Sequence, residues 1–215
     1  MRKDGFFITF EGPEGCGKST HSKLLVNFLE EKGFNVKLTR EPGGTSIGKQ
    51  IREILLDVDN KNLTPMAEFF LLLADRNQNV TENIKPFLSK GYIVISDRYI
   101  DSSIAYQHGG RNIDYNLVKK LNKIATENLK PDITFILIND DIEKALENAK
   151  KESRVIDRFE KESILFHKKI LRLYYKLEKE EKNRVILLNI LENIEDTQNK
   201  IRDIIVKRLK KRGLL

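Results

Sequence analysis

The stretch that decides the fold runs from Phe6 to Thr20 and reads Phe6-Phe7-Ile8-Thr9-Phe10-Glu11-Gly12-Pro13-Glu14-Gly15-Cys16-Gly17-Lys18-Ser19-Thr20. An apolar, β-favouring run ends there in a turn with the spacing G-x-x-x-x-G-K-[ST]. Glycines suit this turn because the backbone must curl until successive N–H groups point at phosphate oxygens. The spacing predicts a phosphate-binding loop, rather than a glycine-rich turn that binds nothing, formed by Gly12, Pro13, Glu14, Gly15, Cys16, Gly17, Lys18, Ser19 and Thr20.

The end of this loop carries the polar groups that a nucleoside triphosphate requires. Lys18 brings a positive charge to the β- and γ-phosphates, and the Ser19 hydroxyl can ligate Mg²⁺. A helix is expected to begin here, and it adds the positive end of its dipole. Its apolar residues recur at helical spacing, at Leu24, Leu25, Phe28 and Leu29.

Length and composition favour one α/β domain over residues 1–215. The chain has 215 residues, 40% of them hydrophobic, and no Pro/Gly/Ser-rich stretch divides it. No apolar run approaches the roughly 20 residues that span a bilayer, and no signal peptide precedes the first strand. We therefore expect a cytoplasmic protein with no membrane partner. The single cysteine, Cys16, excludes an intramolecular disulfide framework and multi-cysteine zinc sites.

The net charge of +7 is concentrated at the end of the chain. The last fifteen residues hold six basic residues and one acid, within a helical pattern formed by Ile201, Ile204, Ile205 and Leu209. Cations stabilise the negative end of a helix dipole. The pattern favours a solvated helix terminus over a nucleic-acid site.

Five apolar runs predict strands, at 6–10, 34–39, 92–96, 133–138 and 184–188. Helical patterns fill the gaps between them, and right-handed helical crossovers connect parallel neighbours. We expect a five-stranded parallel sheet with helices on both faces, a three-layer P-loop NTPase fold. Ligands then bind at the carboxyl ends of the strands.

One predicted helix, at 64–89, contains a segment that is apolar all round. Thr64-Pro65 forms its N-cap and first position, and Phe69 to Leu73 follow without a polar residue, with Arg76 one turn later. A surface helix is usually apolar along one stripe only. We expect one side to pack on its own core and the other against a second subunit, or else under a neighbouring helix.

The remaining motifs favour a small phosphotransferase. The Asp-x-x-Gly switch and the Asn-Lys-x-Asp motif of GTPases are absent from the sequence. At the end of the third strand, Asp97 can hold Mg²⁺ through water and Arg98 can grip an acceptor phosphate, although the two residues could also form a strand-end salt bridge. Clustered cations around 148–160 indicate a mobile lid that brings positive charge to the transferred phosphoryl group, rather than a solvated face.

Together these sequence motifs resemble those of the thymidylate kinase family, and the resemblance covers nearly the whole chain. The resemblance rests on the phosphate loop, Thr39-Arg40-Glu41-Pro42-Gly43-Gly44-Thr45, Ala74-Asp75-Arg76, the block from Asp97 to Gln107, and Asp157-Arg158-Phe159-Glu160. It implies a nucleoside monophosphate kinase type of fold, phosphorylation of dTMP to dTDP with ATP and Mg²⁺, and a homodimer formed through the 64–89 helix. The alternatives are another nucleoside monophosphate kinase or a non-catalytic nucleotide-binding regulator. Arg98 and the arginine-rich lid argue against the regulator.

The resemblance also assigns residues. It implies that Glu14 meets the sugar 3′-hydroxyl, that Arg98 holds the acceptor phosphate beside Arg40 or Arg52, and that Tyr106 lies under C2′. It implies further that Arg76 and Gln107 read the thymine edge near Ser103, and that Glu41 lies near the metal and acceptor. Each of these residues also has an alternative role that involves no substrate. Glu14 could be a solvated loop acid, Arg52 a surface charge, Ser103 a helix cap, Tyr106 a core aromatic and Glu41 a turn former.

The chain departs from the family at two positions. Gly15 stands where some members carry an arginine, which indicates the type whose lid supplies the transition-state arginine, here Arg154 or Arg158. Leu72 stands where an aromatic residue usually stacks on thymine, so either the base binds less tightly or Phe69 or Phe70 substitutes.

Cys16 is expected to be a reactive thiol. It lies among N–H donors beside Lys18 and a helix N-terminus, and all of these lower a thiol pKa. The alternative is an inert small residue that fits the loop.

Overall fold

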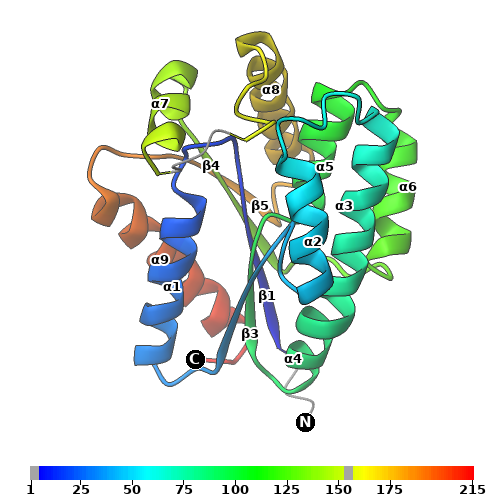
Figure 1. The fold of residues 1–215 in the computed structure, drawn as a ribbon. Helices are drawn as coiled ribbons and strands as arrows, with labels where there is room; N and C mark the ends of the chain where they lie inside the picture. The colour runs from blue at the N-terminus through cyan, green and yellow to red at the C-terminus, as the bar shows by residue number, and fades with distance from the viewer. Residues whose placement is uncertain (1–4, 153–156) are drawn as a thin grey trace.

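The computed structural model describes residues 5–152 and 157–215. Its centre is a five-stranded sheet in the order β2-β3-β1-β4-β5, with every neighbouring pair parallel (Figure 1). The strands are β1 (Phe6–Glu11), β2 (Val36–Arg40), β3 (Ile93–Asp97), β4 (Ile133–Ile138) and β5 (Val185–Asn189). The predicted fold class is confirmed, and each predicted strand lies within two residues of the observed one at either end.

Helical segments cover both faces of the sheet (Figure 1). They are α1 (Lys18–Glu31), α2 (Ser46–Leu56), α3 (Pro65–Asn79), the π-helical η1 (Val80–Ile84), α4 (Lys85–Ser89), α5 (Ile100–Ser103), the π-helical η2 (Ile104–Gly110), α6 (Tyr115–Ala125), α7 (Ile142–Glu152), α8 (Ile164–Glu180) and α9 (Ile194–Lys211). In the described part of the chain, no helix has the length and apolar character that crossing a membrane requires.

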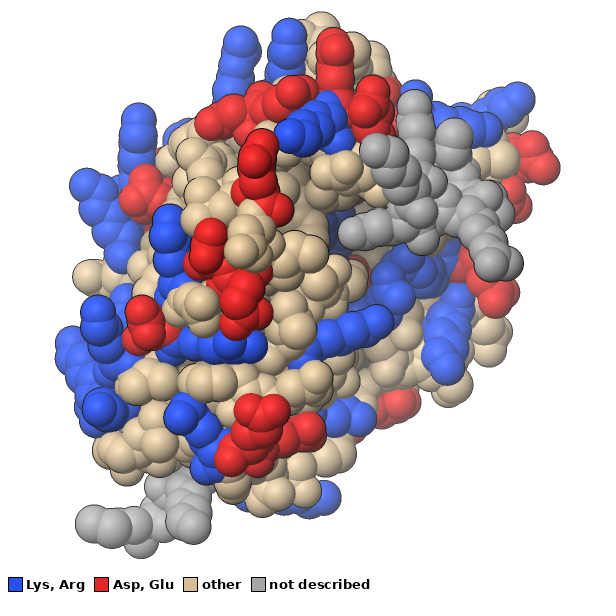
Figure 2. Space-filling model, turned by 90° about the vertical axis from the view of Figure 1, so that its left-hand side faces the viewer, with Lys and Arg blue, Asp and Glu red and all other residues tan. Residues whose placement is uncertain are grey.

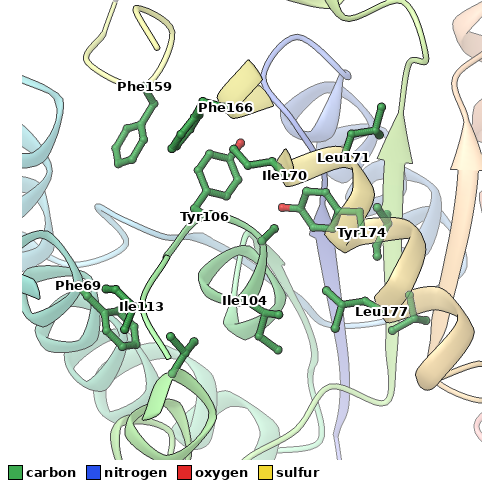
Figure 3. Close-up of a cluster of buried hydrophobic side chains, with 14 of the residues drawn as sticks. Phe69, Ile104, Tyr106, Ile113, Phe159, Phe166, Ile170, Leu171, Tyr174 and Leu177 are labelled. Atoms are coloured by element: carbon green, nitrogen blue, oxygen red, sulfur yellow. The ribbon is translucent and has the colours of Figure 1, made fainter. Parts of the chain in front are cut away.

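Two apolar layers hold the helices on the sheet. On one face, Leu25 and Leu29 of α1 and Ile205 of α9 pack with Phe10 of β1. On the other face, α3, η2 and α8 pack around Tyr106 and Tyr174, as Figure 3 shows. Strands β1, β3 and β4 are buried along their whole length because helices cover both of their faces.

The strand register places three functional loops at one edge of the sheet. Phe10 of β1 and Arg40 of β2 both lie opposite Asp97 at the end of β3. The loops that follow these three strands are the predicted phosphate loop, the Glu41-Pro42 turn and the Arg98 segment. Their polar side chains therefore meet at the carboxyl edge of the sheet.

The apolar stretch at 64–89 is one continuous helical run made of α3, η1 and α4. The Thr64 side chain accepts a hydrogen bond from the Ala67 N–H and caps the run. Phe69 is fully buried in the core, whereas Phe70 is 55% exposed. One side of the helix packs on its own core, as predicted, and no neighbouring helix covers Phe70 in the described part of the chain.

Candidate active site

The phosphate loop has the backbone that its glycines predict. Gly12 has φ +134° and Gly15 has φ +67°, a region that favours glycine. A Cβ at Gly12 would lie 2.0 Å from the carbonyl oxygen of Leu137, so no side chain fits there. Gly17 precedes α1 without a side-chain cap, which leaves the N–H groups of the first turn open to an anion.

Lys18 is buried at the start of α1, and its ammonium group donates to the carbonyl oxygen of Pro13 within the loop. Burial, followed by repulsion from Arg98, lowers the pKa of Lys18 below its ordinary value. The amine is therefore held against the loop, where phosphate oxygens would replace the Pro13 contact.

Ser19 and Asp97 form a pair of oxygen ligands. The Ser19 hydroxyl donates to the Asp97 carboxylate over 2.5 Å, which joins the start of α1 to the end of β3. Magnesium is usually bound by one or two protein oxygens together with substrate phosphates and water. The described residues contain no group of three or more His, Cys, Asp or Glu side chains suited to a metal ion. This donor set fits Mg²⁺ held jointly with a nucleotide.

The Arg98 side chain reaches the phosphate loop instead of pairing with Asp97, its neighbour in the sequence. Its backbone has φ +73°, and its guanidinium donates to the carbonyl oxygen of Gly12 (3.0 Å) and to Glu14 Oε1 (3.0 Å). It also lies 5.0 Å from the ring centroid of Tyr106. The ion-pair partner of Arg98 is thus Glu14, and the alternative of a strand-end salt bridge with Asp97 is wrong.

Glu14 is the centre of a polar cluster. The Tyr106 hydroxyl lies 2.7 Å from each of its carboxylate oxygens, and His167 Nδ1 lies 3.6 Å from Oε2. Burial alone would raise the pKa of Glu14, but Arg98, Lys18 and the Tyr106 hydroxyl outweigh it and lower that pKa. Glu14 is therefore an ionised acceptor and not a solvated loop acid.

One cleft brings the predicted acceptor residues together. All ten of them line it, namely Glu14, Arg40, Glu41, Arg52, Leu72, Arg76, Arg98, Ser103, Tyr106 and Gln107. They come from the end of β2, from the loops after β1, β2 and β3, and from α2, α3, α5 and η2. Figure 2 shows a hollow with basic side chains at its wall beside the grey residues.

Arg76 is held rigidly at the base of this cleft. Its guanidinium donates to Glu41 (2.7 Å), Ser103 Oγ (2.7 Å), the Tyr99 carbonyl (2.8 Å) and Asn122 Oδ1. Ser103 thus accepts from Arg76, and its hydroxyl is not a helix cap. Burial raises the pKa of Glu41 despite Arg76 beside it.

Two further arginines lie at the mouth of the cleft. Arg52 donates to the Pro42 carbonyl (3.0 Å), and Arg40 is exposed. Burial, followed by repulsion from Arg40, lowers the pKa of Arg52 to about 10. Two neighbouring cations favour an anion between them.

The aromatic residue that accompanies Tyr106 in the cleft is not one of the two expected to substitute for Leu72. Neither Phe69 nor Phe70 lines it, because Phe69 is in the core and Phe70 faces outward. Phe159 lines it instead and meets Tyr106 edge-to-face, with ring centroids 5.9 Å apart (Figure 3). The proposed substitution by Phe69 or Phe70 is wrong. The sequence signal for Phe159 is its place in the string Asp157-Arg158-Phe159-Glu160.

Of the two candidate lid arginines, Arg154 lies outside the described residues. Arg158 donates to Glu68 (2.7 Å) and to the Leu55 carbonyl (3.0 Å), and its backbone N–H donates to the Leu56 carbonyl (3.2 Å). Arg158 is therefore engaged with α2 and α3.

A second cleft lies on the other side of the phosphate loop. Sequence reasoning missed its lining outside the loop, which includes His21, Lys144, Asn148, Leu191, Glu192 and Ile194. These residues come from α1, α7 and the segment after β5, where no motif marks them. Gly15 and Gly17 line both clefts. Two ligands bound in them would therefore meet at the phosphate loop.

The structure contradicts the prediction that Cys16 is a reactive thiol. It is fully buried among apolar side chains, and burial raises the pKa of its thiol despite Lys18 nearby. The expectation of a reactive thiol is wrong because desolvation of the thiolate outweighs the charge and the loop N–H groups.

We expect iodoacetamide to label native Cys16 slowly and at the same rate with or without ATP, because the thiol is buried and mainly protonated. Mass spectrometry of the alkylated peptide measures this, with the urea-unfolded chain as the reference for full reactivity. Rapid native labelling that ATP suppresses would contradict the burial argument.

Comparison with known proteins decides the family. The family model described as thymidylate kinase matches residues 10–201. The chain belongs to the thymidylate kinase family. Family membership makes it a phosphotransferase and confirms the prediction that it phosphorylates dTMP.

Individual thymidylate kinases match over nearly their full length. The chain is 46% identical over 211 residues to thymidylate kinase from a Sulfurihydrogenibium species, with 98% of this chain and 100% of the relative covered. It is 46% identical to thymidylate kinase from Geotalea daltonii, with 95% and 98% covered. The crystal structure of Ehrlichia chaffeensis thymidylate kinase superposes with a TM-score of 0.76 at 32% identity, covering 94% of this chain and 98% of that one.

Proposed function

We propose that this member of the thymidylate kinase family transfers the γ-phosphoryl group of ATP to the phosphate of dTMP across the phosphate loop. The observation that carries the proposal is the pair of clefts that share Gly15 and Gly17. ATP occupies the cleft that includes Lys144 and Leu191, and dTMP occupies the cleft that includes Arg98 and Tyr106. The chain acts as one domain with a lid around 148–160.

Phosphoryl transfer in this site needs positioning and positive charge. An acceptor phosphate oxygen is already a nucleophile, so no general base is required. Lys18 and the loop N–H groups bind the donor phosphates, and Ser19 and Asp97 hold Mg²⁺. When bound, Mg²⁺ neutralises charge on the donor phosphates. Arg98 holds the acceptor phosphate beside Arg40 and Arg52.

The nucleoside of dTMP occupies the inner part of the cleft. Arg76 and Gln107 read the thymine edge near Ser103, and Leu72 and Phe159 cover the base. Glu14 accepts from the 3′-hydroxyl, and Tyr106 lies under C2′. Glu41 supports this subsite by neutralising Arg76.

We assign the transition-state arginine to Arg154. The Arg158 guanidinium is paired with Glu68, which leaves it as a residue that positions the end of the lid. This assignment rests on the sequence of the lid and on the engagement of Arg158.

A homodimer through α3, η1 and α4 is also part of the proposal. An exposed Phe70 on a helix that is otherwise half-buried supports it. No nucleic-acid or membrane partner is required, and the protein acts in the cytoplasm.

The function is tested by steady-state ADP release with dTMP, dUMP, dCMP, dGMP and AMP as acceptors. The highest kcat/KM is expected with dTMP and requires Mg²⁺. A preference for another monophosphate would favour the alternative of a different nucleoside monophosphate kinase. Nucleotide binding without ADP release would favour a non-catalytic regulator.

Deoxyribose selection is expected to depend on Tyr106. A 2′-hydroxyl would meet the ring and lose its water partners, at a combined cost of about 1 to 3 kcal/mol. We expect kcat/KM to favour dTMP over its ribose counterpart by about tenfold to a hundredfold. The Tyr106→Ala variant should reduce this ratio, chiefly by improving the ribose substrate. An unchanged ratio would leave sugar selection to Glu14 and its neighbours.

A further inference from the structure

Glu68 of α3 is a fully buried carboxylate that three side chains share. Its Oε1 accepts from the Gln107 amide (3.0 Å) and from Arg111 Nε (3.2 Å). Its Oε2 accepts from Arg111 Nη2 (3.0 Å) and from Arg158 Nη2 (2.7 Å). Glu68 itself does not line the acceptor cleft, but Gln107 does.

The partners of Glu68 determine the role of its oxygens. The guanidinium groups of Arg111 and Arg158 carry donors and no acceptor, so both carboxylate oxygens of Glu68 accept. With both oxygens engaged as acceptors, Glu68 presents no donor to a further neighbour. Any hydrogen-bonding group that faces it must therefore be a donor.

This restriction fixes the side-chain amide of Gln107. Only its NH₂ group can face Glu68, so the carbonyl oxygen lies on the opposite edge of the amide. No residue in the described part of the chain donates a hydrogen bond to that oxygen. Because Gln107 lines the cleft, this oxygen is the acceptor that Gln107 can offer a base there.

We infer that Glu68 is a positioning residue for pyrimidine specificity, which holds Gln107 as an acceptor toward the base. The inference rests on the proposed function. Thymine carries a donor at N3, which an amide oxygen accepts, whereas cytosine presents a lone pair there. Arg76 has one N–H left, on Nη2, because its other four N–H groups donate to Glu41, Ser103, Asn122 and the Tyr99 carbonyl. That N–H suits a carbonyl at C4 and opposes the amino group of cytosine. The pair then rejects cytosine at both positions.

The test compares kcat/KM for dTMP and dCMP in the wild type and in Glu68→Gln. In the variant, the new amide at position 68 can donate as well as accept. The side-chain amide of Gln107 can therefore rotate by about 180° and present its NH₂ group to the base. We expect the dTMP-to-dCMP ratio to fall by about tenfold or more, through a higher KM for dTMP with the KM for ATP unchanged. Glu162→Gln is the matched control, since Glu162 pairs with the same Arg111 (2.5 Å) without contacting Gln107. Its ratio should remain that of the wild type.

A second variant, Glu68→Asp, keeps a carboxylate for both arginines but is one methylene shorter, so we expect it to retain more of the dTMP-to-dCMP ratio than Glu68→Gln, and circular dichroism shows which variants fold. A wild-type ratio in folded Glu68→Gln would overturn the inference, as would a larger fall in Glu68→Asp than in Glu68→Gln or an equal loss of kcat with both acceptors. The wild type alone also tests it, because equal use of dCMP and dTMP would contradict an acceptor at Gln107. Failure of the proposed function is distinct, since the wild type would then not phosphorylate dTMP at all.

Discussion

The Arg154→Ala variant is expected to lose about 10³-fold in kcat, with the KM for ATP and for dTMP little changed. An arginine that meets the transferred phosphoryl group only in the transition state contributes to kcat and not to ground-state binding. The phosphate loop has Gly15 and no arginine, and our proposal therefore assigns this charge to the lid. Steady-state kinetics with both nucleotides varied separates kcat from the two KM values.

Arg158→Ala is the matched control within the same segment. Its guanidinium lies on Glu68 and on the Leu55 carbonyl, so we expect a smaller loss that appears mainly in the KM for dTMP. A larger loss of kcat in Arg158→Ala than in Arg154→Ala would reverse the assignment. Near-normal kcat in both variants would mean that the lid supplies no transition-state charge.

The Arg98→Lys variant is expected to lower kcat/KM for dTMP by about 10²-fold while the KM for ATP stays close to the wild-type value. The Arg98 guanidinium is a planar fork of donors that holds Gly12 and Glu14, and in its proposed role the same fork aligns an acceptor phosphate. Lysine keeps the charge but presents it at a single point. The acceptor phosphate would therefore lose its alignment with the donor.

Arg202→Lys provides the control for this substitution. Arg202 is on α9, where it pairs with Glu195 and lines neither cleft. Its variant should keep wild-type kinetics, and thermal unfolding should show that both variants are folded. If Arg98→Lys kept kcat/KM within about threefold of the wild type, Arg98 would not be the acceptor-phosphate residue.

Local sequence signals predicted the fold well. The strands could be found because buried parallel strands are continuous apolar runs, and the phosphate loop because its backbone demands glycine at fixed spacing. The acceptor residues converge because Arg40, Arg76 and Arg98 follow motifs at neighbouring strand ends or on a helix beside them.

The errors concern contacts between distant segments. Arg158 pairs with Glu68, ninety residues earlier in the chain, and no periodicity reveals that pairing. The prediction that Cys16 is reactive was wrong because Cys16 is buried beside α7, in the same apolar cluster as Ala145. Phe69 and Phe70 differ by 100° around a helix, which places them in the core and in solvent and leaves the cleft to Phe159.

The contact between the phosphate loop and α7 has a mechanical consequence. A Cβ at Gly15 would lie 1.8 Å from the carbonyl oxygen of Ala145, so the two backbones touch with no side chain between them. Close-packed backbone transmits displacement because it has no soft side chain to absorb it. We therefore expect any movement of the phosphate loop to be passed on to α7, which leads directly into the segment proposed as the lid. The absence of a side chain at position 15 couples the phosphate loop mechanically to the segment that contains Arg154.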